Sequence, residues 1–201
     1  MGKDTFNEAE RFLLSNWAVS RELELSMQEV RDKYTAVAKR VIDTVRGRHE
    51  DLDVEYIGVT QHWGEGYLAL GRKAWHPADW PTGYYVESIR LELLSDESAP
   101  PPSAYIWLKP ALKEGVVFAD ACAAIHKAAR KILSEDEMRR CELMNDGETA
   151  LRLEILPDRK SLLEMLSQAD SQAFVDCLVS HFEILVKFNE VMDGALAKTR
   201  S

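Results

Sequence analysis

The sequence predicts an α+β fold, in which an antiparallel β-meander and a further hairpin are packed by helices, with long helices near both ends. Three observations predict it. Apolar residues recur every three or four positions toward both ends of the 201-residue chain, residues 52–110 contain segments with β-type alternation, and turn residues separate those segments. No repeat or long linker interrupts this order, so we expect a single domain over residues 1–201.

The first expected element is a helical segment over residues 1–48. Its apolar residues step alternately by four and three, which is the a/d seam of a helix that packs against another long helix. Ser20 to Glu22 is expected to interrupt the helix, because Ser-Arg-Glu can restart one. Gly47 is expected to mark the end, where basic residues suit the negative end of the helix dipole.

The β-meander is expected over residues 52–110. The segments "LDVEYIGVT" and "YLALGR" flank a Gly-Glu-Gly turn and predict a hairpin. The segment "YYVESIRLELL" alternates as a half-buried antiparallel strand does. A connector with three prolines follows, and "AYIWLKP" supplies the fourth strand.

A helix and a second hairpin are expected next. Residues 114–133 carry a broad apolar stripe at helical spacing, rich in alanine, which indicates close packing. Residues 140–156 predict the hairpin, with Asn-Asp-Gly at residues 145–147 forming its turn.

The last part of the chain, residues 158–199, is expected to be helical. Asp158 caps a short helix, and Asp170 or Ser171 starts the final one. The apolar residues of that final helix again step by four and three, so it carries a second seam.

Charge and cysteine content limit the classes of function. A net charge of −9 and a pI near 5.1 argue against a general nucleic-acid binder, which needs a basic surface. No apolar run reaches the roughly 20 residues of a membrane span, and the first residues do not resemble a signal peptide. Cys122, Cys141 and Cys177 are widely spaced and predict free thiols in a cytoplasmic protein.

Motifs for the common chemistries are missing from the sequence. There is no phosphate-binding loop, no GxSxG nucleophile elbow and no spacing of Cys or His that suits zinc. A metal-dependent nuclease of the restriction type needs (D/E)xK on a strand, but Trp107 stands where the acid should precede Lys109. The sequence therefore assigns no cofactor, no metal and no catalytic residue, and an enzyme is not favoured.

An aromatic stretch at residues 61–85 is the candidate ligand site. Aromatic walls with a few polar groups are typical of ligand pockets, although such rings more often form core or contact surface. Tyr85 is expected to form the walls of this site together with the Trp residues and Tyr84 of the stretch. The candidate ligand-binding residues are His62, Trp63, Trp75, His76, Trp80, Tyr84 and Arg90.

The two seams are the candidate protein interface, because a small sheet alone does not cover two long helices. They are expected to pair with each other, with a second copy of the chain, or with both. The candidate interface residues are Leu23, Met27, Val30, Tyr34, Val37, Phe174, Leu178, Leu185 and Phe188.

Three functional hypotheses follow. The leading one is a non-enzymatic cytoplasmic interaction module, acting as a homodimer or as an accessory subunit of a larger bacterial or phage complex. The second is a receptor for a small molecule or peptide that uses the aromatic stretch. The third is a degenerate or metal-dependent nuclease-like accessory domain of a phage-defence or restriction system, with Glu87 or Glu92 as its acid.

Overall fold

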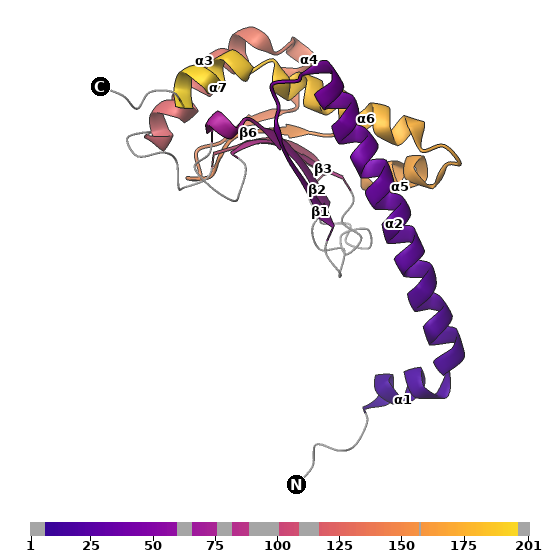
Figure 1. Ribbon diagram of the computed structural model, residues 1–201. Coiled ribbons are helices and arrows are strands. Elements are labelled where there is room, and N and C mark those ends of the chain that lie inside the picture. Colours follow the sequence, from indigo (N-terminus) through magenta and orange to yellow (C-terminus); the bar gives the residue numbers. More distant parts are fainter. Residues whose placement is uncertain are drawn as a thin grey trace. The chain divides into compact units, whose positions relative to one another are not determined.

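The computed structural model describes residues 7–59, 66–75, 82–88, 101–108, 117–156 and 158–196 (Figure 1). It confirms the predicted fold class: an antiparallel sheet of six strands is combined with helices, and a long helix precedes the sheet. The helices are α1 (Glu8–Ser15), α2 (Trp17–Arg48), α3 (Phe118–Ile132), α4 (Glu135–Arg139), α5 (Arg159–Ser167), α6 (Gln172–Val186) and α7 (Asn189–Leu196), with a short 3-10 helix, η1 (Lys73–Trp75). The strands are β1 (Val54–Val59), β2 (Gly66–Gly71), β3 (Gly83–Glu87), β4 (Ser103–Trp107), β5 (Cys141–Leu143) and β6 (Thr149–Glu154).

The chain divides into two compact units, residues 1–36 and residues 37–201. Helix α2 begins in the first unit and ends in the second. The expectation of a single domain over the whole chain stays a prediction.

The first unit contains α1 and the first part of α2. Asn7 caps α1 with a complete capping box: its Oδ1 accepts from Glu10 N at 2.9 Å, and Glu10 Oε2 accepts from Asn7 N at 2.6 Å. The helix ends at Asn16, whose Nδ2 donates to the carbonyl of Phe12 at 2.9 Å. The break expected at Ser20–Glu22 was therefore wrong, because a capping Asn lies four residues earlier and α2 runs straight through that site.

The second unit is built on the sheet, whose strand order is β1-β2-β3-β4-β6-β5 with every pair antiparallel. The expected meander and second hairpin are both present. The second hairpin turns where Asn-Asp-Gly was expected, and Gly147 has the positive φ of 93° that such a turn requires. Gly83 is needed for a different reason: a Cβ there would lie 2.4 Å from the carbonyl oxygen of Leu70 on the neighbouring strand.

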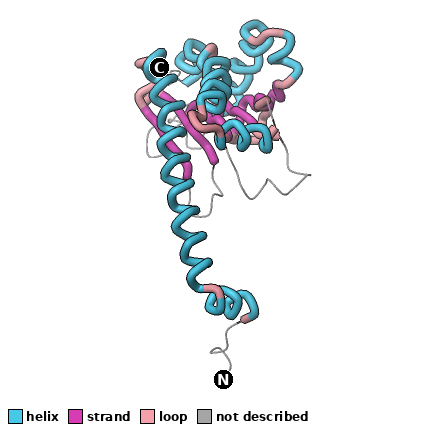
Figure 2. The backbone as a smooth tube through the Cα atoms, turned by 90° about the vertical axis from the view of Figure 1, so that its right-hand side faces the viewer, coloured by secondary structure: helices cyan, strands magenta, loops and turns pink. Residues whose placement is uncertain are grey.

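Helices cover one face of this sheet. Helix α6 contacts β3 and β4, α3 contacts β6 and α7, and the ribbon view places these helices on the same side of the sheet (Figure 1). Figure 2 shows the helices in cyan and the strands in magenta from a second direction. Because side chains alternate along a strand, the register brings one apolar set under these helices. The buried members of that set are Leu68, Leu70, Tyr84, Val86, Ala104, Ile106, Leu151 and Leu153.

The helices after the sheet start at the expected caps. Asp158 Oδ1 accepts from Ser161 N at 2.9 Å at the start of α5, and α6 starts directly after Ser171. The final helix is in two pieces, because the chain makes a tight turn in which Phe188 N donates to the carbonyl of Leu185 at 3.0 Å.

Candidate interaction surface

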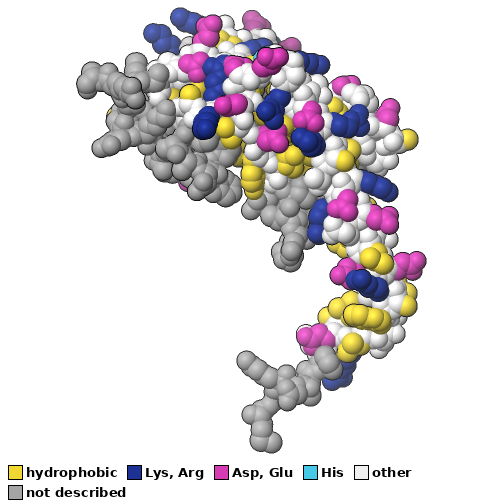
Figure 3. Space-filling model, in the orientation of Figure 1, with side chains coloured by type: hydrophobic (Ala, Val, Ile, Leu, Met, Phe, Trp, Pro, Cys, Tyr) yellow, Lys and Arg dark blue, Asp and Glu magenta, His cyan; other side chains and the backbone are white. Residues whose placement is uncertain are grey.

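The most unusual surface of the described chain is apolar and lies at residues 12–30. Among the described residues, eleven large hydrophobic side chains are exposed, and nine of them lie in this short segment. Their exposed fractions run from 49% to 66%. Figure 3 shows hydrophobic side chains on the surface of this helical segment. The nine residues are Phe12, Leu13, Leu14, Trp17, Val19, Leu23, Leu25, Met27 and Val30.

Four of these residues form one stripe along α2. Val19, Leu23, Met27 and Val30 are spaced by four, four and three, so they share one side of the helix. We call this stripe, together with the exposed Phe12, Leu13, Leu14 and Trp17, the N-terminal apolar face. Leu25 is exposed as well but points to the opposite side of α2.

The other side of α2 is occupied by polar pairs within the helix. Arg21 donates to Glu24 at 2.5 Å, and Gln28 Nε2 donates to Asp32 at 2.8 Å while its Oε1 accepts from Arg31 at 3.0 Å. These pairs hold the charged side chains along one flank, so α2 is amphipathic here. An amphipathic helix gains most of its stability when its apolar side is covered.

The predicted interface residues have different surroundings. Leu23, Met27 and Val30 are exposed, Tyr34 is buried and Val37 is half-buried. The members on α6 and at its end are all fully buried in the core: Phe174, Leu178, Leu185 and Phe188. Whether any of these residues contacts another chain stays a prediction, but only Leu23, Met27 and Val30 are more than half exposed.

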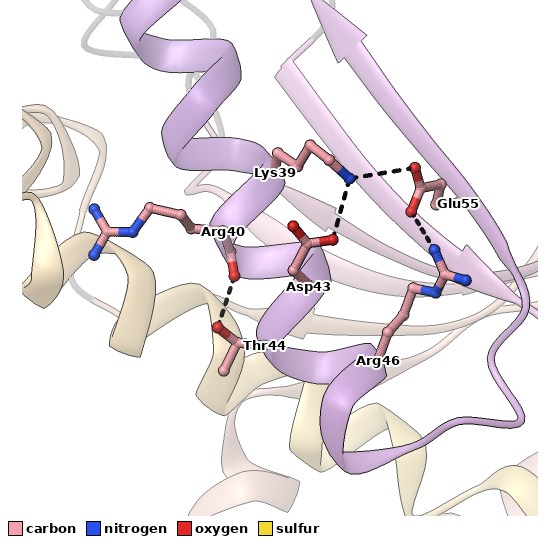
Figure 4. A network of polar contacts seen from close by, with 6 residues as sticks. All are labelled: Lys39, Arg40, Asp43, Thr44, Arg46 and Glu55. Atoms are coloured by element: carbon pink, nitrogen blue, oxygen red, sulfur yellow. Dashed lines mark hydrogen bonds and ion pairs between the residues drawn. The ribbon is translucent and has the colours of Figure 1, made fainter.

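The basic residues at the end of α2 are paired with groups of the second unit. Lys39 lies 3.1 Å from Asp43, and Arg46 lies 2.6 Å from Glu55, which is also 3.9 Å from Lys39 (Figure 4). Arg40 donates at 2.9 Å to a backbone carbonyl. These contacts hold the end of α2 to β1 and to the start of α6. Asp43 and Glu55 offset the charges of Lys39 and Arg46, which a nucleic acid would otherwise meet.

Two of the candidate ligand-binding residues lie in the described part of the chain, Trp75 and Tyr84. Trp75 is buried, its Nε1 donates to Asp193 at 2.7 Å, and its ring meets Tyr84 edge-on at 5.4 Å. The Tyr84 hydroxyl donates to Asn189 at 2.7 Å, and burial raises the pKa of that hydroxyl. Both rings therefore hold α7 to the sheet. The other candidates lie outside the described residues: His62, Trp63, His76, Trp80 and Arg90.

Tyr85 lies on the opposite sheet face from Tyr84, because neighbouring residues of a strand alternate. Its ring meets that of Trp107 edge-on at 5.1 Å. Glu87 is on the same face, with only 3% of its side chain exposed, and forms an ion pair with Arg159 at the start of α5. Glu87 is thus a buried structural acid in this structure; Glu92, the other acid of the nuclease hypothesis, lies outside the described residues.

The structure brings Cys122 and His126 together, but not as a catalytic dyad. The Sγ and Nε2 atoms are 3.2 Å apart on α3. The same Nε2 lies 2.9 Å and 2.8 Å from the carbonyl oxygens of Met144 and Ala150, which can only accept. Nε2 must therefore carry a hydrogen and cannot take the thiol proton. Burial also raises the pKa of the Cys122 thiol, so this pair ties α3 to the β5–β6 hairpin.

The other two cysteines are also protonated thiols near neutral pH. Burial raises the pKa of Cys141 and of Cys177 to about 11. A thiolate nucleophile needs the opposite shift. All three cysteines are free.

His181 is a buried histidine in the core of the second unit. Burial lowers the pKa of its ring, a hydrogen bond to the carbonyl of Cys177 at 2.8 Å opposes that shift, and the charge of Arg140 adds to it. Since a carbonyl only accepts, Nδ1 carries the hydrogen. His181 is thus a neutral residue of the core near neutral pH.

The described ranges contain neither a candidate metal site nor a candidate membrane span. No group of three or more His, Cys, Asp or Glu side chains there is placed to hold a metal ion. No helix within the same ranges is long and apolar enough to span a membrane.

The sequence signal for the N-terminal apolar face was incomplete. The seam identified Leu23, Met27 and Val30, but it missed Phe12, Leu14 and Val19. The dense apolar run around "RFLLSNW" would have been the signal, since it is too rich in large apolar residues for a solvated helix.

In comparisons with known proteins, no family model, no curated protein and no solved structure matches this chain.

Proposed function

We propose that this protein is a non-enzymatic, cytoplasmic protein-interaction module, acting as a homodimer or as an accessory subunit, and that the N-terminal apolar face is its docking surface. The observation that carries the proposal is the concentration of exposed large apolar side chains in residues 12–30. Contiguous exposed apolar surface on a soluble protein commonly marks an interaction site.

The size of the face supports the proposal. A fully exposed aliphatic side chain offers roughly 100 Å² and an aromatic one about 200 Å² of apolar area. Weighted by exposure, the eight residues of the face offer on the order of 600 Å². One partner in a standard interface contributes about 800 Å², of which somewhat more than half is apolar. The summed exposed apolar area of these residues is therefore comparable with the apolar part of one side of a standard interface.

The rest of the described chain supports a binding role rather than catalysis. Its three cysteines are protonated thiols. His126 Nε2 carries a hydrogen and so cannot accept the proton of the Cys122 thiol. The Glu87 carboxylate is held in an ion pair with Arg159. The basic residues at the end of α2 are paired with the chain's own acceptors, which supports a protein partner over a nucleic acid. Free thiols support a reducing compartment.

The test is native mass spectrometry of the untagged 22.8 kDa chain purified from its own host. The variant Leu23→Glu/Val30→Glu places two charges on the face. Its matched control is Leu25→Glu, which adds a charge at a leucine of similar exposure on the opposite side of α2. We expect the wild type and the control to form an assembly, and the double variant to lose it with an unchanged circular dichroism spectrum.

An assembly that survives in the double variant would overturn the proposal. So would a wild-type chain that is a monomer without any bound protein at all concentrations tested.

A further inference from the structure

We propose that the partner of the N-terminal apolar face is a basic, apolar segment of another protein. Its apolar side chains would cover the stripe on α2, while its Lys or Arg side chains pair with Glu22 and Glu29. This inference rests on the proposed function above, and it adds the chemistry of the partner.

Two glutamates border the stripe along one flank of α2. Glu22 directly precedes Leu23 and Glu29 directly precedes Val30, so each lies about 100° around the helix from a stripe residue. The two glutamates are separated by two turns, about 10 Å along the axis, and therefore share one flank. A partner that covers the stripe comes close to both carboxylates.

The chain itself does not neutralise these two carboxylates. Both glutamates are exposed, and within the described ranges neither side chain has a hydrogen bond or an ion pair. The only Lys or Arg in residues 17–30 is Arg21, and it is already paired with Glu24 at 2.5 Å. The negative charge on this flank is therefore left for a partner to meet.

Covering the stripe also takes water away from this flank. A carboxylate that loses water without gaining a cation is unfavourable, whereas one that gains a Lys or Arg forms a charge-assisted hydrogen bond. Apolar surface bordered by unpaired carboxylates thus favours a partner that brings both apolar side chains and cations.

The same charges disfavour two other occupants. A second copy would bring its own Glu22 and Glu29, and its residues 17–30 hold no base other than the paired Arg21. A membrane with anionic lipids would meet the same carboxylates, whereas helices that lie on such a surface carry Lys and Arg on their polar side. A basic segment of another protein meets neither repulsion, which corresponds to an accessory subunit.

Binding of a synthetic peptide to the full-length protein tests the inference. The probe is a fluorescein-labelled helical peptide of about five turns, with leucines on one side and lysines on the other. A second peptide carries glutamates in place of the lysines. The protein variant is Glu22→Gln/Glu29→Gln, and its matched control is Glu148→Gln/Glu164→Gln, which removes two exposed carboxylates from the second unit and gives the same net charge.

We expect the lysine peptide to bind the wild type and the control with equal affinity in fluorescence anisotropy. Its affinity for Glu22→Gln/Glu29→Gln should be about tenfold lower at low salt, and the difference should shrink at high salt. The glutamate peptide should not bind. Equal affinity of the lysine peptide for the variant and its control would overturn the inference.

The variant Leu23→Ser/Val30→Ser, which removes apolar side chains without adding charge, separates this inference from the proposed function. If it abolishes an assembly that Glu22→Gln/Glu29→Gln leaves unchanged, then the basic partner is wrong and the docking surface stands. If neither an assembly nor binding of the lysine peptide responds to Leu23→Ser/Val30→Ser, then both are wrong.

Discussion

Leu23 and Leu178 differ in exposure, and the same substitution in each compares a surface leucine with a core leucine. Leu178 is 0% exposed, so Leu178→Ala should lower the free energy of unfolding by about 2–5 kcal/mol. Leu23 is 60% exposed, so its side chain is only about two-fifths buried, and Leu23→Ala removes only that fraction of the burial free energy. At about 1.5–3 kcal/mol for a fully buried leucine, Leu23→Ala should cost about 1 kcal/mol or less, and the higher helix propensity of alanine offsets part of that.

The assay is urea unfolding followed by far-UV circular dichroism, at a protein concentration low enough to keep the chain monomeric. We expect a lower midpoint for Leu178→Ala and a nearly unchanged one for Leu23→Ala. In the assembly of the chain with its partner, Leu23→Ala should in addition weaken binding. A loss of 2 kcal/mol or more for Leu23→Ala in the monomer would refute the reasoning, because the side chain would then be covered by its own chain.

The remaining predictions concern the second unit. Burial lowers the pKa of His181 below its ordinary value of 6.5, so between these two values the unfolded chain binds more protons at this residue than the folded chain does. The free energy of unfolding should therefore fall on acidification through this window, by up to about 1.4 kcal/mol per pH unit. His181→Gln should reduce that slope in thermal melts recorded at several pH values. Gly83→Ala should destabilise the sheet by about 1–3 kcal/mol, whereas Gly194→Ala, on an open part of α7, should stabilise by up to about 1 kcal/mol; a shared sign in thermal melts would contradict this. Glu87→Gln removes the charge of Glu87 from its buried ion pair with Arg159 and should destabilise the protein in urea unfolding, and an unchanged midpoint would contradict a stabilising role of this pair.

Local patterns explain why most of the sheet was predictable. Strand alternation and the Asn-Asp-Gly turn are both recognised over a few residues, and they predicted the β1–β2 and β5–β6 pairs. The Glu87–Arg159 ion pair joins residues 72 positions apart, and no local pattern predicts such a contact. The break at Asn16 was missed because Asn and Ser are both good caps, and the choice depends on the carbonyl that Asn16 reaches.

The candidate surface was harder to predict than the fold. A seam repeats in the same way whether it is covered by its own chain or by another, so Leu23 and Leu178 gave the same signal. The structure separates them by exposure alone: α6 carries core residues, and the first part of α2 carries surface residues. Periodicity predicts that a helix side is covered, and only the fold says by which part of the molecule.

Amide hydrogen exchange of residues 17–33, measured at nanomolar and at high micromolar protein concentration, tests the central claim most directly. If the N-terminal apolar face docks onto another molecule, these amides should exchange fast in the dilute chain and slowly in the assembly, while those of α6 stay protected in both. Equal and strong protection of residues 17–33 at both concentrations would contradict the claim, because the chain itself would then cover the face.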